Sequence, residues 1–171
     1  MRDAATVLGV CLVLIACAAD APGDASDTAA TADTARDVAA DAAAAEAVLD
    51  DFFAAMEGWD YDALRATVTA DFELVEDTVV MSMDDFVAFI EPFEAQGASM
   101  TWELSDHNTE VDGDVAWTRY VNRAVMTTDG QETRFHWLES AVFTRQPDGS
   151  WKIDRLQSNP VSIEGATAEG G

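Results

Sequence analysis

The chain has 171 residues, of which 33 are acidic and 9 are basic, for a formal net charge of −24. This length allows one domain with appendages. Binding of nucleic acid requires lysine and arginine to displace counterions, so the composition argues against a nucleic-acid partner. An anionic membrane surface would also repel the chain.

The N-terminus predicts a secretory signal with a lipid attachment site. Residues 7–16 form an apolar run that is too short to span a membrane as a helix, and Leu14, Ile15 and Ala16 directly precede Cys17. The run resembles the bacterial lipobox, which implies cleavage after Ala16 and lipidation of Cys17. We therefore expect a lipoprotein of the bacterial cell envelope, in the outer membrane and facing the periplasm. An ordinary secretory signal would instead give a secreted protein.

Four regions follow from this interpretation. Residues 1–16 are the predicted signal peptide, and residues 18–32 are small and acidic, which predicts a disordered tether. Residues 33–160 contain the large apolar side chains and form the predicted domain, and residues 161–171 a flexible tail. The membrane is then contacted only through the lipid anchor.

No metal site and no cofactor is predicted. The two cysteines, Cys11 and Cys17, both lie in the N-terminal segment, so they cannot form a site in the domain. The two histidines, His107 and His136, do not lie in a motif with ligand spacing.

The first half of the domain predicts three helices. Residues 33–57 repeat apolar side chains at steps of three and four, which indicates a long amphipathic helix. Asp60 can cap a short second helix. Ser82 and Asp85 have the spacing of a capping box at the start of a third. Short strands are expected between the second and third helices.

The second half changes to a period of two, which predicts four strands joined by turns that contain Asp-Gly. Helices followed by an antiparallel meander indicate an α+β fold with the helices on one sheet face. The four predicted strands span residues 99–110, 114–128, 131–145 and 150–159.

Alternation assigns the strand residues to two faces. Four of the five tryptophans fall on one face, which we expect to meet the helices. The other face, with Tyr120, His136 and Leu138, is half apolar, which favours a homodimer through this outer face. The residues assigned to the inner face are Met100, Trp102, Leu104, Val115, Trp117, Arg119, Val121, Trp137, Glu139, Ala141, Phe143, Trp151, Ile153, Arg155 and Gln157.

Residues 44–159 resemble the nuclear transport factor two-like superfamily, in its SnoaL-like and ketosteroid isomerase-like branch. The segments that carry the resemblance are FFAAMEGWDYDALRATVTADF, SMDDFVAFIEPF, VDGDVAWTRY and RQPDGSWKIDRLQS. The resemblance implies a cone in which a curved antiparallel sheet wraps around the long helix and two shorter helices. It also implies a cavity at the open end. It does not imply one activity, because this fold hosts many.

The catalytic residues of the isomerase branch are only partly present. The resemblance places the carboxylate base at Asp77, the tyrosine of the oxyanion hole at Phe52 and its protonated acid at Ala141. Phe52 has no hydroxyl and Ala141 no acid, so steroid isomerisation by that mechanism is not expected. Glu139 lies one inward step away from Ala141.

The predicted pocket combines these positions with the aromatic inner face. Glu139 is either an acid or base with a raised pKa, or the partner of Arg119 or Arg155 in a buried ion pair. Asp77 is either a base or a solvated turn residue. The residues predicted to line the pocket are Phe52, Tyr61, Trp102, Trp117, Arg119, Trp137, Glu139, Trp151, Arg155 and Gln157.

Three functions are compatible with this pattern. The first is a binding domain for a small apolar or mildly polar molecule in the aromatic cavity. The second is a cofactor-independent acid/base enzyme of the isomerase, cyclase or hydratase type that uses Asp77 or Glu139. The third is an oligomerisation domain with a vestigial pocket.

Overall fold

The computed structural model describes residues 37–161, which lie within one of the two units into which the chain divides. The predicted signal peptide, the lipidation site Cys17 and the tether 18–32 lie outside the described residues, as do residues 162–171 of the tail. These assignments stay predictions. In the described part of the chain, no helix is long and apolar enough to cross a membrane.

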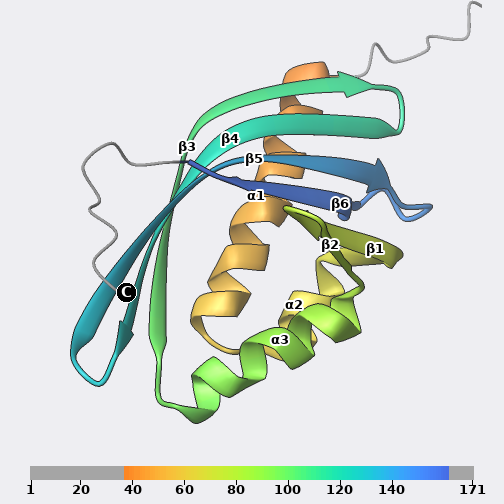
Figure 1. Ribbon diagram of the computed structural model, residues 1–171. Coiled ribbons are helices and arrows are strands. Elements are labelled where there is room, and N and C mark those ends of the chain that lie inside the picture. Colours follow the sequence, from red (N-terminus) through yellow and green to blue (C-terminus); the bar gives the residue numbers. More distant parts are fainter. Residues whose placement is uncertain (1–36, 162–171) are drawn as a thin grey trace, which may run out of the picture. The chain divides into compact units, whose positions relative to one another are not determined.

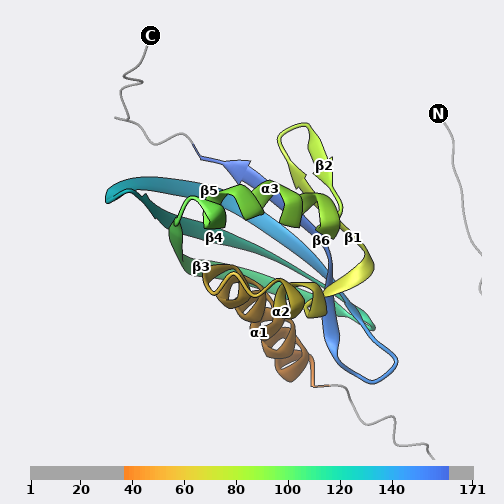
Figure 2. The ribbon, with the colours of Figure 1, turned by 90° about the horizontal axis from the view of Figure 1, so that it is seen from below.

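The described residues fold into three helices and six strands, as the α+β prediction requires. The helices lie on the concave face of one strongly curved sheet, which confirms the cone (Figures 1 and 2). The elements are α1 (Val38–Glu57), α2 (Tyr61–Ala66), β1 (Val68–Glu76), β2 (Val79–Met81), α3 (Met83–Ala95), β3 (Ser99–Asp112), β4 (Val115–Thr128), β5 (Gln131–Arg145) and β6 (Trp151–Pro160).

The sheet has the strand order β2-β1-β6-β5-β4-β3. Strands β3 to β6 form the predicted antiparallel meander, and β1 joins it by pairing parallel to β6. The β4–β5 turn has positive φ at both Asp129 (52°) and Gly130 (76°). A two-residue hairpin turn of this kind matches the right-handed twist of the strands, which explains the Asp-Gly sequence.

The predicted starts of the second and third helices are confirmed by their caps, whereas α1, predicted from residue 33, begins at Val38 with Asp37 as its N-cap. The side chain of Asp60 accepts a hydrogen bond from the Ala63 amide at 2.9 Å. At α3, the Ser82 hydroxyl accepts from the Asp85 amide at 3.2 Å and the Asp85 carboxylate accepts from the Ser82 amide at 3.1 Å, so the capping box is complete.

The core lies between α1 and the concave face of the sheet. The buried stripe of α1 includes Ala45, Leu49, Phe52 and Met56, as its periodicity predicts. Val38, at the start of the same stripe, is 54% exposed. The alanine-rich first turns of α1 therefore extend beyond the packed part of the domain.

Strand β4 turns toward the helices the set of side chains that alternation assigned to the outer face. Ala116, Tyr120 and Asn122 are buried on the concave side, whereas Trp117 and Arg119 are exposed on the outer side. Both faces of this strand are half apolar, so hydrophobicity alone does not distinguish them. The observed face buries the small side chain of Ala116 and lets Asn122 donate a hydrogen bond to Glu139.

Strand β6 departs from simple alternation because it contains a β-bulge. Ile153 pairs with Phe143 and Arg155 with the adjacent Val142, so β6 has one extra residue at this point. Beyond the bulge the facing of the strand is reversed. Leu156 is buried, and Arg155 and Gln157, which we predicted to point inward, are exposed.

Candidate functional site

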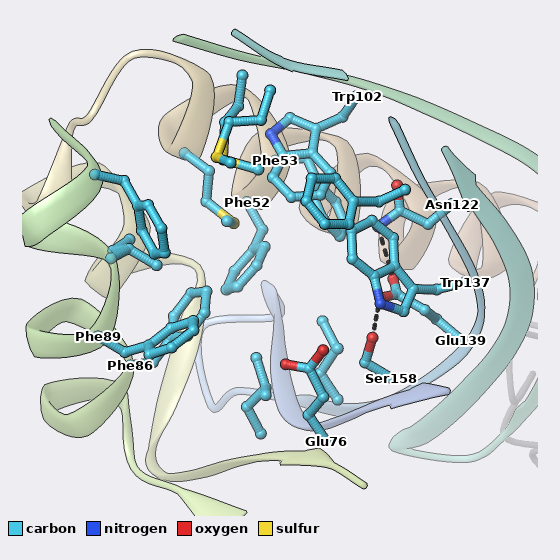
Figure 3. Close-up of a pocket in the computed structure, with 18 residues that line it drawn as sticks. Phe52, Phe53, Glu76, Phe86, Phe89, Trp102, Asn122, Trp137, Glu139 and Ser158 are labelled. Carbon is cyan, nitrogen blue, oxygen red and sulfur yellow. Dashed lines mark hydrogen bonds between the residues drawn. The ribbon is translucent and has the colours of Figure 1, made fainter. Parts of the chain in front are cut away.

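A cavity of about 220 Å³ opens between α1, α3 and the concave face of the sheet (Figure 3). Eight of its eighteen lining residues are aromatic, and its polar lining groups come from Glu76, Asn122, Glu139 and Ser158. The aromatic residues are Phe52, Phe53, Phe86, Phe89, Phe93, Trp102, Phe135 and Trp137. The aliphatic and thioether residues are Met56, Leu74, Ile90, Met100, Met126 and Leu156.

The aromatic rings form two walls. On the helical side, Phe52 of α1 stacks on Phe86 of α3, with ring centroids 6.2 Å apart and planes 13° apart. On the sheet side, Trp137 stacks on Phe135 at 5.1 Å and lies 6.1 Å from Trp102. The cavity therefore presents ring faces from both sides, a shape that suits a flat apolar molecule.

Glu139 of β5 supplies the buried polar group of the site. Glu139 is 4% exposed, and its carboxylate accepts hydrogen bonds from Ser158 Oγ at 2.6 Å and Asn122 Nδ2 at 3.0 Å. Ser158 and Asn122 come from the strands on either side of β5. All three side chains converge in Figure 3.

Burial raises the pKa of Glu139 above its ordinary value of 4.5, although the hydrogen bonds from Ser158 and Asn122 and the nearby hydroxyl of Tyr120 oppose this rise. The pKa of Tyr120 is raised well above 10.0, by burial and then by the charge of Glu139. The Tyr120 hydroxyl has no partner with hydrogen-bond geometry among the described residues, yet it is close enough for this mutual influence. On its other side, Tyr120 stacks against His107 at 5.5 Å.

Glu76 at the end of β1 is a second carboxyl group in the cavity (Figure 3). Burial raises its pKa, the charge of Asp77 adds to the rise, and a hydrogen bond from Trp137 lowers it. The charge of Glu76 in turn raises the pKa of Glu139. The cavity thus contains two carboxyl groups with raised pKa values, one buried and one half-buried.

The predicted ion pair between Glu139 and an arginine is wrong. Arg119 lies exposed on the outer face, because β4 shows its other side to the cavity. Arg155 lies beyond the β6 bulge and pairs with Glu73 at 2.6 Å on that outer side. The hydrogen-bond partners of Glu139 in the described part of the chain are neutral.

Four of the ten predicted pocket residues line the cavity, namely Phe52, Trp102, Trp137 and Glu139. Trp117, Arg119, Arg155 and Gln157 do not, because of the β4 facing and the β6 bulge.

The other two predicted pocket residues pack elsewhere. Tyr61 donates a hydrogen bond to Glu94 of α3 at 2.6 Å. Its pKa is raised to about 12 by partial burial and then by Glu94. Trp151 is buried, but its ring lies under the guanidinium of Arg145 at 4.4 Å.

The structure places Asp77 in the turn after β1, exposed and with φ of 51°. Its neighbour Glu76 lines the cavity instead, and the role of Asp77 as a base stays a prediction. Asn122 and Ser158 were missed because their strand facing was assigned wrongly. Phe86 and Phe89 of α3 also line the cavity, and the sequence does not indicate that this helix reaches it.

The two isomerase positions that lack functional groups do lie inside the domain. Ala141 is fully buried on the concave face, and Phe52 lines the cavity. Among residues 37–161, no group of three or more histidine, cysteine or acidic side chains is placed to hold a metal ion.

Comparison with known proteins gives a family and a fold. The family model described as SnoaL-like domain matches residues 45–161. Among curated proteins none matches this chain.

Solved structures with the same fold share little sequence. A ketosteroid isomerase-like protein from Erwinia carotovora atroseptica is 20% identical, with a TM-score of 0.59 over 72% of this chain and 98% of that chain. A conserved protein from Planctomyces limnophilus is 18% identical, with a TM-score of 0.65 over 73% and 99%. A nuclear transport factor two-like protein of unknown function from Pseudomonas putida is 17% identical, with a TM-score of 0.61 over 74% and 91%.

The raised pKa of Glu139 predicts how stability depends on pH. The folded state holds this proton more tightly than the unfolded state does. The protonated Glu139 therefore contributes to the free energy of unfolding in full below the ordinary pKa of 4.5. This contribution is lost as the pH rises through the pKa of Glu139 in the folded state. Glu139→Gln should therefore make the free energy of unfolding, measured by urea denaturation, decline less between pH 4 and 8. Glu103→Gln removes the same charge from an exposed position and should leave the decline as in wild type. Parallel curves for wild type and Glu139→Gln would contradict the assignment.

Proposed function

The chain belongs to the SnoaL-like domain family, and we propose that it is a binding domain for a small, largely apolar molecule with one or two polar groups. One observation carries the proposal: eight aromatic side chains surround a cavity whose polar groups are few and convergent. Sites for small molecules combine an apolar lining with a few polar groups in this way.

Unpartnered polar atoms in the lining support the same function. The Oδ1 atom of Asn122 and the Nε1 atom of Trp102 are buried without a hydrogen-bond partner among the described residues. A buried polar atom without a partner is costly. A ligand with a donor near Asn122 and an acceptor near Trp102 would satisfy both.

Two tryptophans allow a matched test of this proposal. Trp137 lines the cavity, whereas Trp117 is 40% exposed on the outer face. Trp137→Ala should weaken binding of a neutral apolar dye such as Nile red by about tenfold or more, because it removes a large stacking surface. Trp117→Ala should leave binding within about twofold. Fluorescence titration of the purified protein measures both.

The outcome can go against the proposal in two ways. If wild-type protein does not bind the dye, the cavity does not admit apolar ligands and the proposed function fails. If Trp117→Ala weakens binding as much as Trp137→Ala, the dye binds the outer face instead of the cavity.

A cofactor-independent acid/base enzyme is the second candidate, and one observation favours it. Glu76 and Glu139 are two carboxyl groups with raised pKa values that line one largely apolar cavity, and a raised pKa suits a carboxyl group to proton transfer. Glu76, which lines the cavity, is then the base, in place of the exposed Asp77.

The enzyme candidate predicts a measurable exchange reaction. In D₂O, the protein should speed the exchange of the α-protons of small cyclic ketones for deuterium. NMR measures the rate of this exchange. Glu76→Gln should reduce the rate by about a hundredfold, the contribution expected of a general base. Asp77→Asn is the neighbouring control and should retain most of the rate. Equal rates with and without protein would remove this candidate.

The outer face of the sheet supports the expectation of a homodimer. Leu138 and Trp117 are each 40% exposed there. The chain has a net charge of −24, yet the outward positions of β4 to β6 carry five of its nine basic residues and only two acidic ones. The outward positions of the adjacent β3 carry three acidic residues. The basic residues are Arg119, Arg123, Arg134, Lys152 and Arg155. The acidic ones are Glu132 and Asp154, and on β3 Glu103, Glu110 and Asp112.

Because a two-fold contact places the same surface on both partners, the acidic β3 row of one copy can face the basic rows of the other. We propose that two copies associate here. Leu138→Glu should then shift sedimentation at micromolar concentration from dimer to monomer. Val80→Glu, a charge placed on an apolar side chain of β2 that is 59% exposed, should not. A wild-type monomer would contradict the proposal.

A further inference from the structure

We propose that the cavity is built for a hydrophobic organic ammonium ion, a molecule of one or two rings with a protonated amine. This inference rests on the proposed binding function and narrows it to one chemical class. It depends on the charge balance of the lining, on an unpartnered acceptor and on the ring faces that surround both.

The charge balance comes first. Two of the lining residues, Glu76 and Glu139, are acidic, and the eighteen include no lysine, arginine or histidine. A buried carboxylate is normally paired with a cation, because removing a charge from water is costly. Here the bonds to Glu139 come from Ser158 and Asn122, which are neutral. The site therefore has the negative half of an ion pair, and a bound ammonium would supply the positive half.

Asn122 provides the second observation. Its Nδ2 donates to Glu139, which fixes the orientation of the amide and leaves Oδ1 as an acceptor without a partner. The residue is 0% exposed and lines the cavity. An ammonium group has several N–H donors, so one can bind Oδ1 while another binds the carboxylate of Glu139. A carboxylate ligand or a carbonyl group would bring one more acceptor to this place.

The aromatic walls provide the third. Trp102, Trp137 and Phe135 form the sheet-side wall of the cavity that Glu76 also lines. The face of an aromatic ring attracts a cation, most strongly for tryptophan and in a desolvated site. The same rings hold the apolar part of the molecule. The aromatic lining and the carboxyl groups thus favour one kind of ligand.

Three probes of similar shape and different charge test the inference. The purified protein is titrated by calorimetry at pH 8 with naphthalen-1-ylmethylamine, naphthalen-1-ylmethanol and naphthalen-1-ylacetate. The amine should bind about tenfold tighter than the alcohol, the size of one charge-assisted contact. The acetate should bind more weakly than the alcohol. Equal binding of amine and alcohol would overturn the inference and leave the proposed function intact. No binding of any probe would count against both.

A charge-matched variant separates the site from the general acidity of the chain. A protein of net charge −24 attracts any cation weakly through its long-range field. Glu139→Gln and Glu103→Gln each remove one negative charge, but Glu103 is exposed on the outer face. The preference for the amine should fall to about twofold in Glu139→Gln and remain in Glu103→Gln. An equal loss in both would assign the preference to net charge and overturn the inference.

The pH dependence of wild-type binding is an independent test that needs no variant. Protons and ammonium compete for the carboxyl groups of Glu139 and Glu76, whose pKa values are raised. The other titratable groups nearby are Asp77, Tyr120 and His107. Affinity for the amine should fall severalfold from pH 8 to pH 5, while affinity for the alcohol changes little. Constant affinity for the amine would contradict the inference.

Discussion

The domain buries the carboxyl group of Glu139 without a positive charge beside it, and the arrangement of three strands depends on this constraint. Tyr120 of β4 and Ser158 of β6 both pair with Glu139 of β5, so one row across the sheet surrounds the carboxyl group with hydroxyls. Asn122 adds its amide from the next inward position of β4. A shift of one residue in either strand pairing would turn these groups to the outer face and leave the carboxyl group unsatisfied.

The β-bulge in β6 determines the chemistry of the cavity as well as the course of the strand. With regular alternation, Arg155 and Gln157 would point inward beside Glu139. The extra residue reverses this, so that Ser158 donates to the carboxylate and Arg155 pairs with Glu73 outside. One inserted residue thus keeps a guanidinium away from the cavity. The cavity keeps its negative character because of this local irregularity.

The sequence predicts the fold well because its signals are local: the Ser82–Asp85 cap, the Asp129-Gly130 turn and the period of two are each read within a few residues. The site is harder to predict because each strand facing depends on contacts with other strands. Alternation found Trp102, Trp137 and Glu139. Alternation failed for β4 because the two faces of this strand are similarly apolar. It also failed beyond the β6 bulge, because no residue type in the sequence indicates that a bulge lies there.

Two positions that differ from the isomerase branch explain why the shared fold does not indicate a shared activity. Ala141 leaves the acid position of that branch empty, while Glu139 places a carboxyl group two residues further along the strand, about 6–7 Å away. Phe52 replaces the helix hydroxyl with a ring that stacks on Phe86. Polar groups therefore gather on the sheet alone, and the helical wall is apolar. If the proposed binding function holds, a ligand would point its polar end toward Glu139 and its apolar end toward α1 and α3.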